Sequence, residues 1–195
     1  MNRRFGRGDA AFDTGLFRVA DGTLVNPFLN PFASSSELPV DFLAGAAIAA
    51  GRIEAGTKSR IAVHPHIFEV TVLLAGTLRV HMKDPARRTP YAIELSAAHG
   101  AGGFPAAAVA TEPGTFFQLD NTAGTEDAHV LYVTSPGFIF EPGPTAEDPP
   151  VYDDAVVFED SWQWLANCDW APPSLFDPAR SAGARAAARS RILRR

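Results

Sequence analysis

The sequence predicts an all-β fold, either a sandwich or a barrel built from short strands. Between the expected strands lie clusters of turn-forming residues such as DPARRTP, HGAGG and DNTAGTED. No helical pattern interrupts the series, and many short strands separated by turn signals are typical of a sandwich or barrel. The expected strands cover residues 40–54, 60–64, 69–75, 77–82, 91–95, 106–111, 115–120 and 128–134.

The first 37 residues are expected to form an N-terminal arm. They contain an Asp-Gly turn, two Asn-Pro steps and a run of serines, which are signals for turns and loops. The arm also carries Phe12, Phe17, Phe28 and Phe32, too many aromatic side chains for a freely solvated segment. We therefore expect it to lie across a sheet, either its own or that of a partner, and we expect a homodimer.

The last part of the chain, residues 143–195, differs in character from the strands before it. Its beginning is rich in proline and acidic residues and should run as an extended connection. The stretch FEDSWQWLANCDW can then form a short helix with aromatic residues at helical spacing. The arginine-rich end, with Asp177 as a cap and Pro178 at the first helical position, predicts a second short helix.

Composition narrows the class of protein. A net charge of −5 argues against nucleic acid as a partner. No apolar run is long enough to span a bilayer, and no apolar stretch follows the first arginines as a secretory signal would require. The single Cys168 excludes an internal disulfide framework and a multi-thiolate metal site. These features predict a cytoplasmic protein without nucleic-acid or membrane partners.

The stretch from Gly56 to Gly76 carries the strongest chemical signal. It places His64, His66 and Glu69 within six residues of a strand-like run. Imidazoles two residues apart on a strand point to the same face. Two imidazoles and a carboxylate are ligands for divalent Fe, Mn, Ni, Co or Zn. The alternative is two histidines on a sheet surface beside a solvated glutamate.

Residues 38–142 resemble a single cupin domain, whose fold is a double-stranded β-helix or jelly-roll barrel. The spacing of Gly56, Glu69 and Gly76 is similar to that of the first cupin motif. The second motif resembles TEPGTFFQLDNTAG, with Pro113 and Gly114 in the turn and Asn121 after it. The resemblance implies a β-barrel that acts on a small organic molecule in its interior.

Two registers are open for the first motif. A strict count from Gly56 places Ala62 where cupins usually have their first metal-binding histidine, with His64 as the second. The other register takes His64 and His66 as the histidine pair, with one residue fewer before Glu69. A β-bulge absorbs a slip of this size. If metal is bound, the second register is favoured, because two imidazoles hold a transition metal better than one.

In the second motif, Gln118 stands five residues after Pro113, where the resemblance implies the last histidine. Its amide oxygen can be a neutral ligand, or the side chain can orient another ligand. The resemblance thus implies a divalent transition metal held by His64, His66, Glu69 and Gln118. Glu69 is also the candidate catalytic base.

The expected substrate pocket is the barrel interior, lined by Leu73, Phe116, His129 and Tyr132. Two function classes remain open. One is a metal-dependent enzyme with dioxygenase, lyase, isomerase or cyclase chemistry, because all of these occur on the cupin fold. The other is a non-catalytic cupin that binds a small ligand or serves as an accessory subunit, which the residues Ala62 and Gln118 favour.

Overall fold

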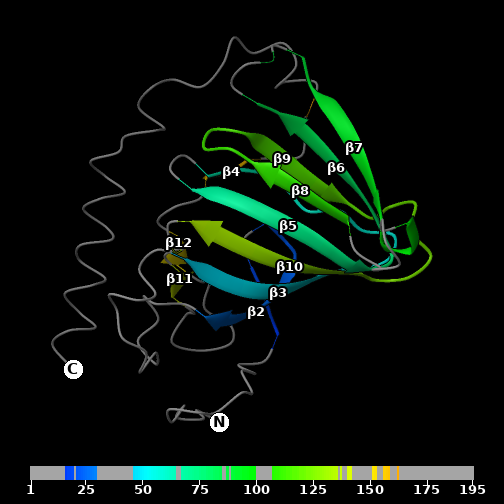
Figure 1. Cartoon of the computed structure of the whole chain (residues 1–195), viewed down its shortest axis with the longest axis horizontal. Coiled ribbons are helices and arrows are strands. Elements are labelled where there is room, and N and C mark those ends of the chain that lie inside the picture. The colour runs from blue at the N-terminus through cyan, green and yellow to red at the C-terminus, as the bar shows by residue number, and fades with distance from the viewer. Residues whose placement is uncertain are drawn as a thin grey trace, which may run out of the picture.

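The protein folds into two antiparallel β-sheets that face each other (Figure 1). The computed structural model describes residues 16–19, 21–29, 46–64, 67–84, 87, 89–99, 107–135, 137, 140–141, 151–152, 156–158 and 162. Within these residues, strands make up nearly all of the regular structure, with one short 3-10 helix, η1 (Ala97–His99). The all-β prediction is therefore confirmed.

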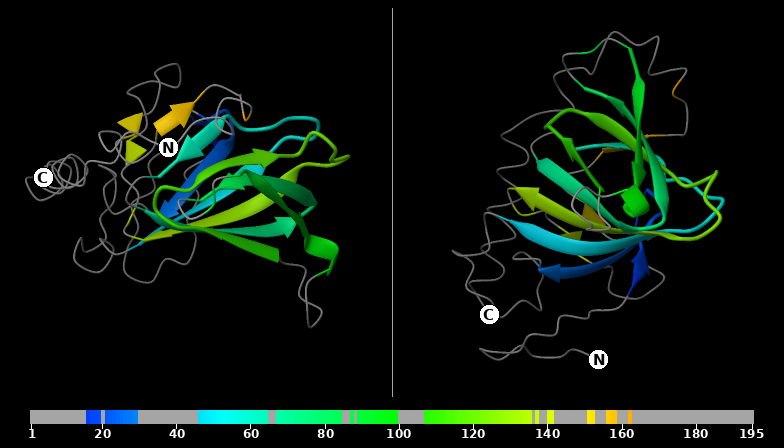
Figure 2. Two further views of the ribbon diagram at one scale, coloured as in Figure 1. Left: turned by 90° about the horizontal axis from the view of Figure 1, so that it is seen from above. Right: turned by 45° about the vertical axis from the view of Figure 1, so that its right-hand side comes forward.

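The first sheet has six strands in the order β1-β2-β3-β10-β5-β8. Strand β10 lies between β3 and β5 and pairs with both along nearly its whole length. Figure 2 shows this sheet as one curved layer. Its strands are β1 (Phe17–Arg18), β2 (Leu24–Leu29), β3 (Ala47–Ile53), β5 (Phe68–Ala75), β8 (Ala107–Thr111) and β10 (Ala128–Ser135).

The second sheet has five strands in the order β13-β4-β9-β6-β7. A separate pair is formed by β11 (Phe140–Glu141) and β12 (Val151–Tyr152). Several strands that follow each other in sequence, such as β5 and β6, belong to different sheets, so the chain crosses repeatedly between the two layers. The strands of the second sheet are β4 (Ile61–Val63), β6 (Thr77–Lys83), β7 (Tyr91–Ser96), β9 (Phe116–Asp120) and β13 (Val156–Phe158).

Most of the expected strands coincide with observed ones, because alternating apolar residues run along the strands and turn-forming residues lie between them. Gly76, for example, closes β5 with a φ of +82°, a conformation that glycine adopts without strain. A Cβ at this position would lie 2.9 Å from the carbonyl oxygen of Asp127, so the close approach of two chain segments also requires glycine. The expected strand 40–54 is described only from Ala47 onward.

Strands outside the predicted barrel limits extend both sheets. From the expected arm, β2 pairs with β3, so this strand lies on the sheet of its own chain. From the C-terminal part, β13 pairs with β4. The domain limits and the homodimer stay predictions. The two C-terminal helices fall outside the described residues, apart from Trp162.

The core lies between the sheets and is filled by alternating residues of each strand. On β9, Phe117 and Leu119 point inward, and on β6 the inward residues are Leu78, Val80 and Met82. Each large apolar side chain buried in this way contributes about 1.5–3 kcal/mol. The first sheet contributes Ile53, Leu73, Val109, Ala128 and Val130 to the same cluster.

Asn121 fixes the loop that follows β9. Its side-chain amide donates to the carbonyl oxygens of Ile53 and Glu126, both at 3.0 Å, and its own backbone carbonyl accepts from Gly56 and Gly124. The residue is 2% exposed. The loop before β10 is therefore tied to the end of β3 by one buried side chain.

Candidate active site

His64 and Glu69 form a buried pair at one end of the barrel. His64 follows β4 directly, and Glu69 is the second residue of β5. The imidazole Nε2 lies 3.3 Å from Oε2 of Glu69, and the two side chains are only 10% and 7% exposed. The backbone carbonyl of His64 accepts a hydrogen bond from the amide of Gly114 at 2.9 Å, which ties the residue to the turn before β9.

Three buried threonines lie next to Glu69 on the interior face of the first sheet. The hydroxyl of Thr71, two residues along β5 on the same face, donates to Oε1 of Glu69 at 3.0 Å. Glu69 is paired across the sheet with Thr134 on β10 and Thr111 on β8, so a row of three polar residues crosses the interior face. All three are buried. One carboxylate oxygen is thus held by Thr71 and the other by His64, which fixes the carboxylate geometry.

A second carboxyl group, Asp21, lies within electrostatic reach of this pair. It belongs to the turn between β1 and β2, and its Oδ1 accepts hydrogen bonds from the amide and hydroxyl of Thr23. Burial raises the pKa of Asp21 above its ordinary value of 3.8, although the bonds from Thr23 act to lower it. Glu69 adds a smaller increase to this pKa, and His64 a smaller decrease. Burial is therefore the dominant influence on the pKa of Asp21.

Apolar side chains wall the pair on its other side. The ring of Phe117 lies 5.3 Å from the imidazole of His64, and Phe117 is the cross-strand partner of Ala62. Both belong to the core, as does Leu73. Tyr132 packs against the same cluster. Of the four residues expected to line a pocket, Leu73 and Tyr132 are therefore on the interior side.

The other two expected pocket residues lie elsewhere. His129 is exposed while its neighbours Ala128 and Val130 are buried in the core, so it points out of the barrel. Phe116 alternates with the inward-pointing Phe117 and is buried on the opposite face of β9. The expectation that His129 lines the barrel interior is therefore wrong, because the inward residues of β10 are the even-numbered ones.

Gln118 also lies on the face of β9 opposite to Phe117 and His64. Its side-chain nitrogen donates to the carbonyl of Ser59 at 2.7 Å, and its side-chain oxygen accepts from the indole of Trp162 at 2.7 Å. The side chain is fully buried by these neighbours. The structure thus brings Glu69 to His64 but does not bring Gln118 to them, and His66 lies outside the described residues.

The donor side chains among the described residues do not complete a transition-metal site. One imidazole and one carboxylate face each other, and the neighbouring interior positions hold the apolar Ala62 and Phe117. Transition-metal sites in proteins generally use three or more such ligands. Among the residues that the structure describes, no group of three His, Cys, Asp or Glu side chains is placed to hold a metal ion.

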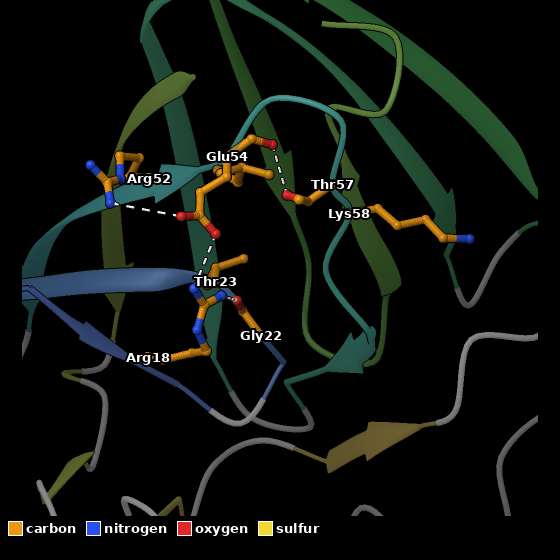
Figure 3. A pocket seen from close by; sticks show the side chains of 8 residues that line it. Arg18, Gly22, Thr23, Arg52, Glu54, Thr57 and Lys58 are labelled. Carbon is orange, nitrogen blue, oxygen red and sulfur yellow. Dashed lines mark hydrogen bonds and ion pairs between the residues drawn. The ribbon is translucent and has the colours of Figure 1, made fainter. Parts of the chain in front are cut away.

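Figure 3 shows a separate shallow hollow beside the turn between β1 and β2. Arg18 lies 3.0 Å from Glu54, and Arg52 lies 3.9 Å from the same carboxylate. These side chains are between 35% and 56% exposed, and such ion pairs contribute little to stability. The hollow resembles a solvated ion-pair network more than a site for chemistry.

Comparison with known proteins places the fold. No family model matches the sequence, and no curated protein matches it. Among solved structures, the capsular polysaccharide assembling protein CapF from Staphylococcus aureus matches 79% of this chain with a TM-score of 0.51 and 13% identity. The match spans 34% of the CapF chain. Peruvianin-I from Thevetia peruviana latex, described as a cysteine peptidase, matches 81% of this chain and 78% of its own, also with a TM-score of 0.51 and 13% identity.

CapF is a double-stranded β-helix cupin, and the two facing antiparallel sheets described above are the same architecture. The chain has the cupin fold. At this level of identity the likeness extends to the fold alone. Within the described residues, no helix has the length and apolar character needed to cross a membrane.

In this fold, the interior positions can be compared with the two sequence motifs. Ala62 belongs to the core and His64 lies beside the inward-pointing ring of Phe117, an arrangement that does not distinguish the two registers of the first motif. The sequence reasoning did not single out Thr71 or Asp21. Alternation along FFQLD predicts that Phe117 and Leu119 share a face and that Gln118 does not, so the signal for Phe117 was present. Asp21 is remote in sequence and carried no such signal.

Proposed function

We propose that this cupin is a small-molecule enzyme whose His64–Glu69 pair transfers a proton to and from a substrate bound in the barrel. The observation that supports it is the 3.3 Å contact between Nε2 of His64 and Oε2 of Glu69 inside a largely apolar interior. A histidine oriented by a buried carboxylate is a common general base, because the carboxylate stabilises the imidazolium that forms.

The roles of the surrounding residues follow from their contacts. Thr71 holds one oxygen of Glu69, so the other stays directed at His64. The ring of Phe117, 5.3 Å from the imidazole, excludes water on that side, which strengthens the electrostatic interaction within the pair. Burial raises the pKa of Asp21, and this carboxyl group is the second proton-transfer group of the proposed site. Proton transfer of this kind serves isomerase and lyase reactions and needs no oxidant.

The test is deuterium transfer from solvent. Wild-type protein is incubated in D2O with a metabolite extract, and incorporation of deuterium into small molecules is followed by mass spectrometry. We expect one compound, or a compound and its isomer, to gain deuterium with wild type. Glu69→Gln should reduce the rate at least about 100-fold, since general acid–base catalysis contributes about 10²–10⁴-fold.

The matched variants make this test specific. Glu69→Gln keeps an acceptor for the Thr71 hydroxyl but cannot stabilise an imidazolium, and His64→Gln keeps the size of the side chain. Glu94→Gln removes an exposed carboxylate on β7 whose partner is Arg79 and should leave the rate unchanged. Equal rates for wild type and Glu69→Gln would refute the proposal.

A metal-dependent enzyme is the second candidate. It is favoured by the proximity of His64 and Glu69 and by the presence of His66 two residues after His64. Such a site would need His66 as its third ligand, because Gln118 faces the other side of β9. Elemental mass spectrometry of tag-free wild type and His66→Ala tests it: about one equivalent of a transition metal, lost in the variant, supports this candidate.

A further inference from the structure

The strand that carries His64 depends on the C-terminal part of the chain. Strand β4 has only three residues, and β9 pairs with just two of them, Ala62 and Val63. On its other edge β13 pairs with all three. Without β13, β4 would be a short edge strand held by two residue pairs. The position of His64 at its end is therefore set partly by residues nearly a hundred positions later.

Trp162 anchors this C-terminal segment four residues after β13. Its indole nitrogen donates to the side-chain oxygen of Gln118 at 2.7 Å, and the nitrogen of Gln118 donates to the carbonyl of Ser59 at 2.7 Å. Ser59 is the second residue before β4, and its hydroxyl accepts from the amide of Leu119 at 3.0 Å. A continuous relay thus runs from Trp162 through Gln118 to the start of β4.

The Trp162 ring packs on the outer face of β6 and β9. The ring lies 6.0 Å from that of His81, the cross-strand partner of Gln118. Nε2 of His81 lies 2.9 Å from Oδ2 of Asp120, so the imidazole is fixed. Burial acts to raise the pKa of Asp120, but hydrogen bonds from Thr122 and His81 outweigh it and hold that pKa below its ordinary value. Asp120 is therefore ionised at neutral pH and holds the His81 ring in the position where it contacts Trp162.

We propose that Trp162 is a positioning residue for His64. It docks the C-terminal segment on the outer face of the second sheet, which holds β13 against β4 and thereby sets the imidazole opposite Glu69. The functional consequence rests on the proposed proton transfer by His64. The positioning of His64 by Trp162 does not depend on that proposal, because it is a property of the protein without substrate.

The physical reason lies in the burial of Gln118, which is 1% exposed. Removing the indole N–H leaves its side-chain oxygen without that donor in a buried place, which is more costly than losing an exposed hydrogen bond. This loss of free energy destabilises the segments that the hydrogen bonds of Gln118 connect, namely the start of β4 and the segment that carries Trp162. Local opening of β13 and β4 should therefore become more frequent, while strands on the other sheet keep their protection.

The experiment compares three variants of the full chain. Trp162→Phe keeps a ring over His81 but loses the N–H donor, and Trp162→Ala loses both. Arg79→Ala is the matched control, because Arg79 lies on the same outer face of β6 in an exposed pair with Glu94. Amide hydrogen exchange is measured for every strand, and the imidazole signals of His64 are followed by NMR on histidine-labelled protein.

We expect Trp162→Phe to raise amide exchange at Ile61–Val63 by about tenfold or more, which corresponds to a lost contribution of about 1.4 kcal/mol. The His64 signals should shift, and exchange in β3 and β10 should stay as in wild type. Unchanged exchange in β4 and unchanged His64 signals in Trp162→Phe would overturn the proposal. An equal rise in every strand would overturn it too, because it would indicate a purely global loss of stability.

These readouts need no substrate, so they separate the two proposals. Local changes at β4 and His64, together with an absence of deuterium transfer by wild type, would support the positioning role and refute the proposed function. If wild type transfers deuterium, Trp162→Phe should lower the rate while Arg79→Ala should not. If Trp162→Phe raises amide exchange in β4 but leaves the rate of deuterium transfer unchanged, the functional part of this inference is overturned.

Discussion

The ring of Phe117 lies 5.3 Å from the imidazole of His64, and the next residue, Gln118, points to the opposite face of the same strand. This alternation decides what the interior of the barrel can do. The ring of Phe117 occupies the position where a further polar metal ligand would be needed. The charged side chain beside the buried imidazole is that of Glu69. The pair is suited to moving a proton between partners held close together.

The opposite orientations of Phe117 and Gln118 lead to a first prediction. Phe117→His adds an imidazole that faces His64 and Glu69, so this variant should bind Zn²⁺ or Co²⁺ at least about tenfold more tightly than wild type, equivalent to about 1.4 kcal/mol. Gln118→His is the matched variant and should give no gain that depends on Glu69, because its side chain faces Ser59, Trp162 and His81 on the outer face of β9. Titration followed by Co²⁺ absorbance measures both. A gain in binding that depends on Glu69 and occurs in Gln118→His alone would contradict the described orientation of β9.

A second prediction concerns Asp21 and pH. Because its pKa is raised in the folded state, the ionised carboxylate destabilises the fold, and the stability present below the ordinary pKa of 3.8 is lost as pH rises through the folded pKa. Asp21→Asn keeps the Oδ1 acceptor for Thr23 and removes the charge. The variant should melt at a higher temperature than wild type at pH 7 and at a similar temperature near pH 3. A lower melting temperature at pH 7 would show that the charge is stabilising.

Thr134 gives a third prediction. Its hydroxyl is buried and has no hydrogen-bond partner among the described residues, although Thr134 is paired across the sheet with Glu69. Thr134→Val should therefore leave stability unchanged or raise it by up to about 1 kcal/mol. Thr111→Val is the control, because the Thr111 hydroxyl lies 3.5 Å from the backbone carbonyl of Glu69. Urea unfolding measures both, and a loss of stability in Thr134→Val larger than in Thr111→Val would contradict this description.

Asn121 gives a fourth prediction. Its amide makes two buried hydrogen bonds to backbone carbonyls that belong to different segments. Asn121→Ala removes both and should lower the free energy of unfolding by about 2–4 kcal/mol. Glu126→Ala leaves the Glu126 carbonyl in place and changes only an exposed side chain, so it should cost little. Equal effects of the two variants in urea unfolding would mean that the amide bonds do not hold the loop.

The strands were largely predictable from the sequence because their signals are local. Alternation within segments such as TLRVHM, and turn residues such as Gly76 between segments, reflect physical constraints that act over a few residues. The same local signal placed His64 and Glu69 close together. Their contact follows from one strand end and one strand start that are five residues apart.

The rest of the site depended on orientation and on distant parts of the chain. Counting from Pro113 led to Gln118, whereas the pleat of β9 turns Phe117 inward, and a displacement of one residue changes the face. The same one-residue error affected His129 on β10. Trp162 and Asp21 come from opposite ends of the chain, and no periodicity connects them to residues 56–76. Their contacts arise from the order of strands in the two sheets.

The most direct test of the central claim is deuterium transfer by wild-type protein that has been freed of metal by a chelator. If the His64–Glu69 pair moves the proton, the metal-free protein should label its substrate at the rate of untreated protein, and Glu69→Gln should be at least about 100-fold slower. Loss of labelling on chelation, restored by adding a transition metal, would contradict this account and favour the metal-dependent candidate. Labelling by Glu69→Gln at the wild-type rate would contradict it as well.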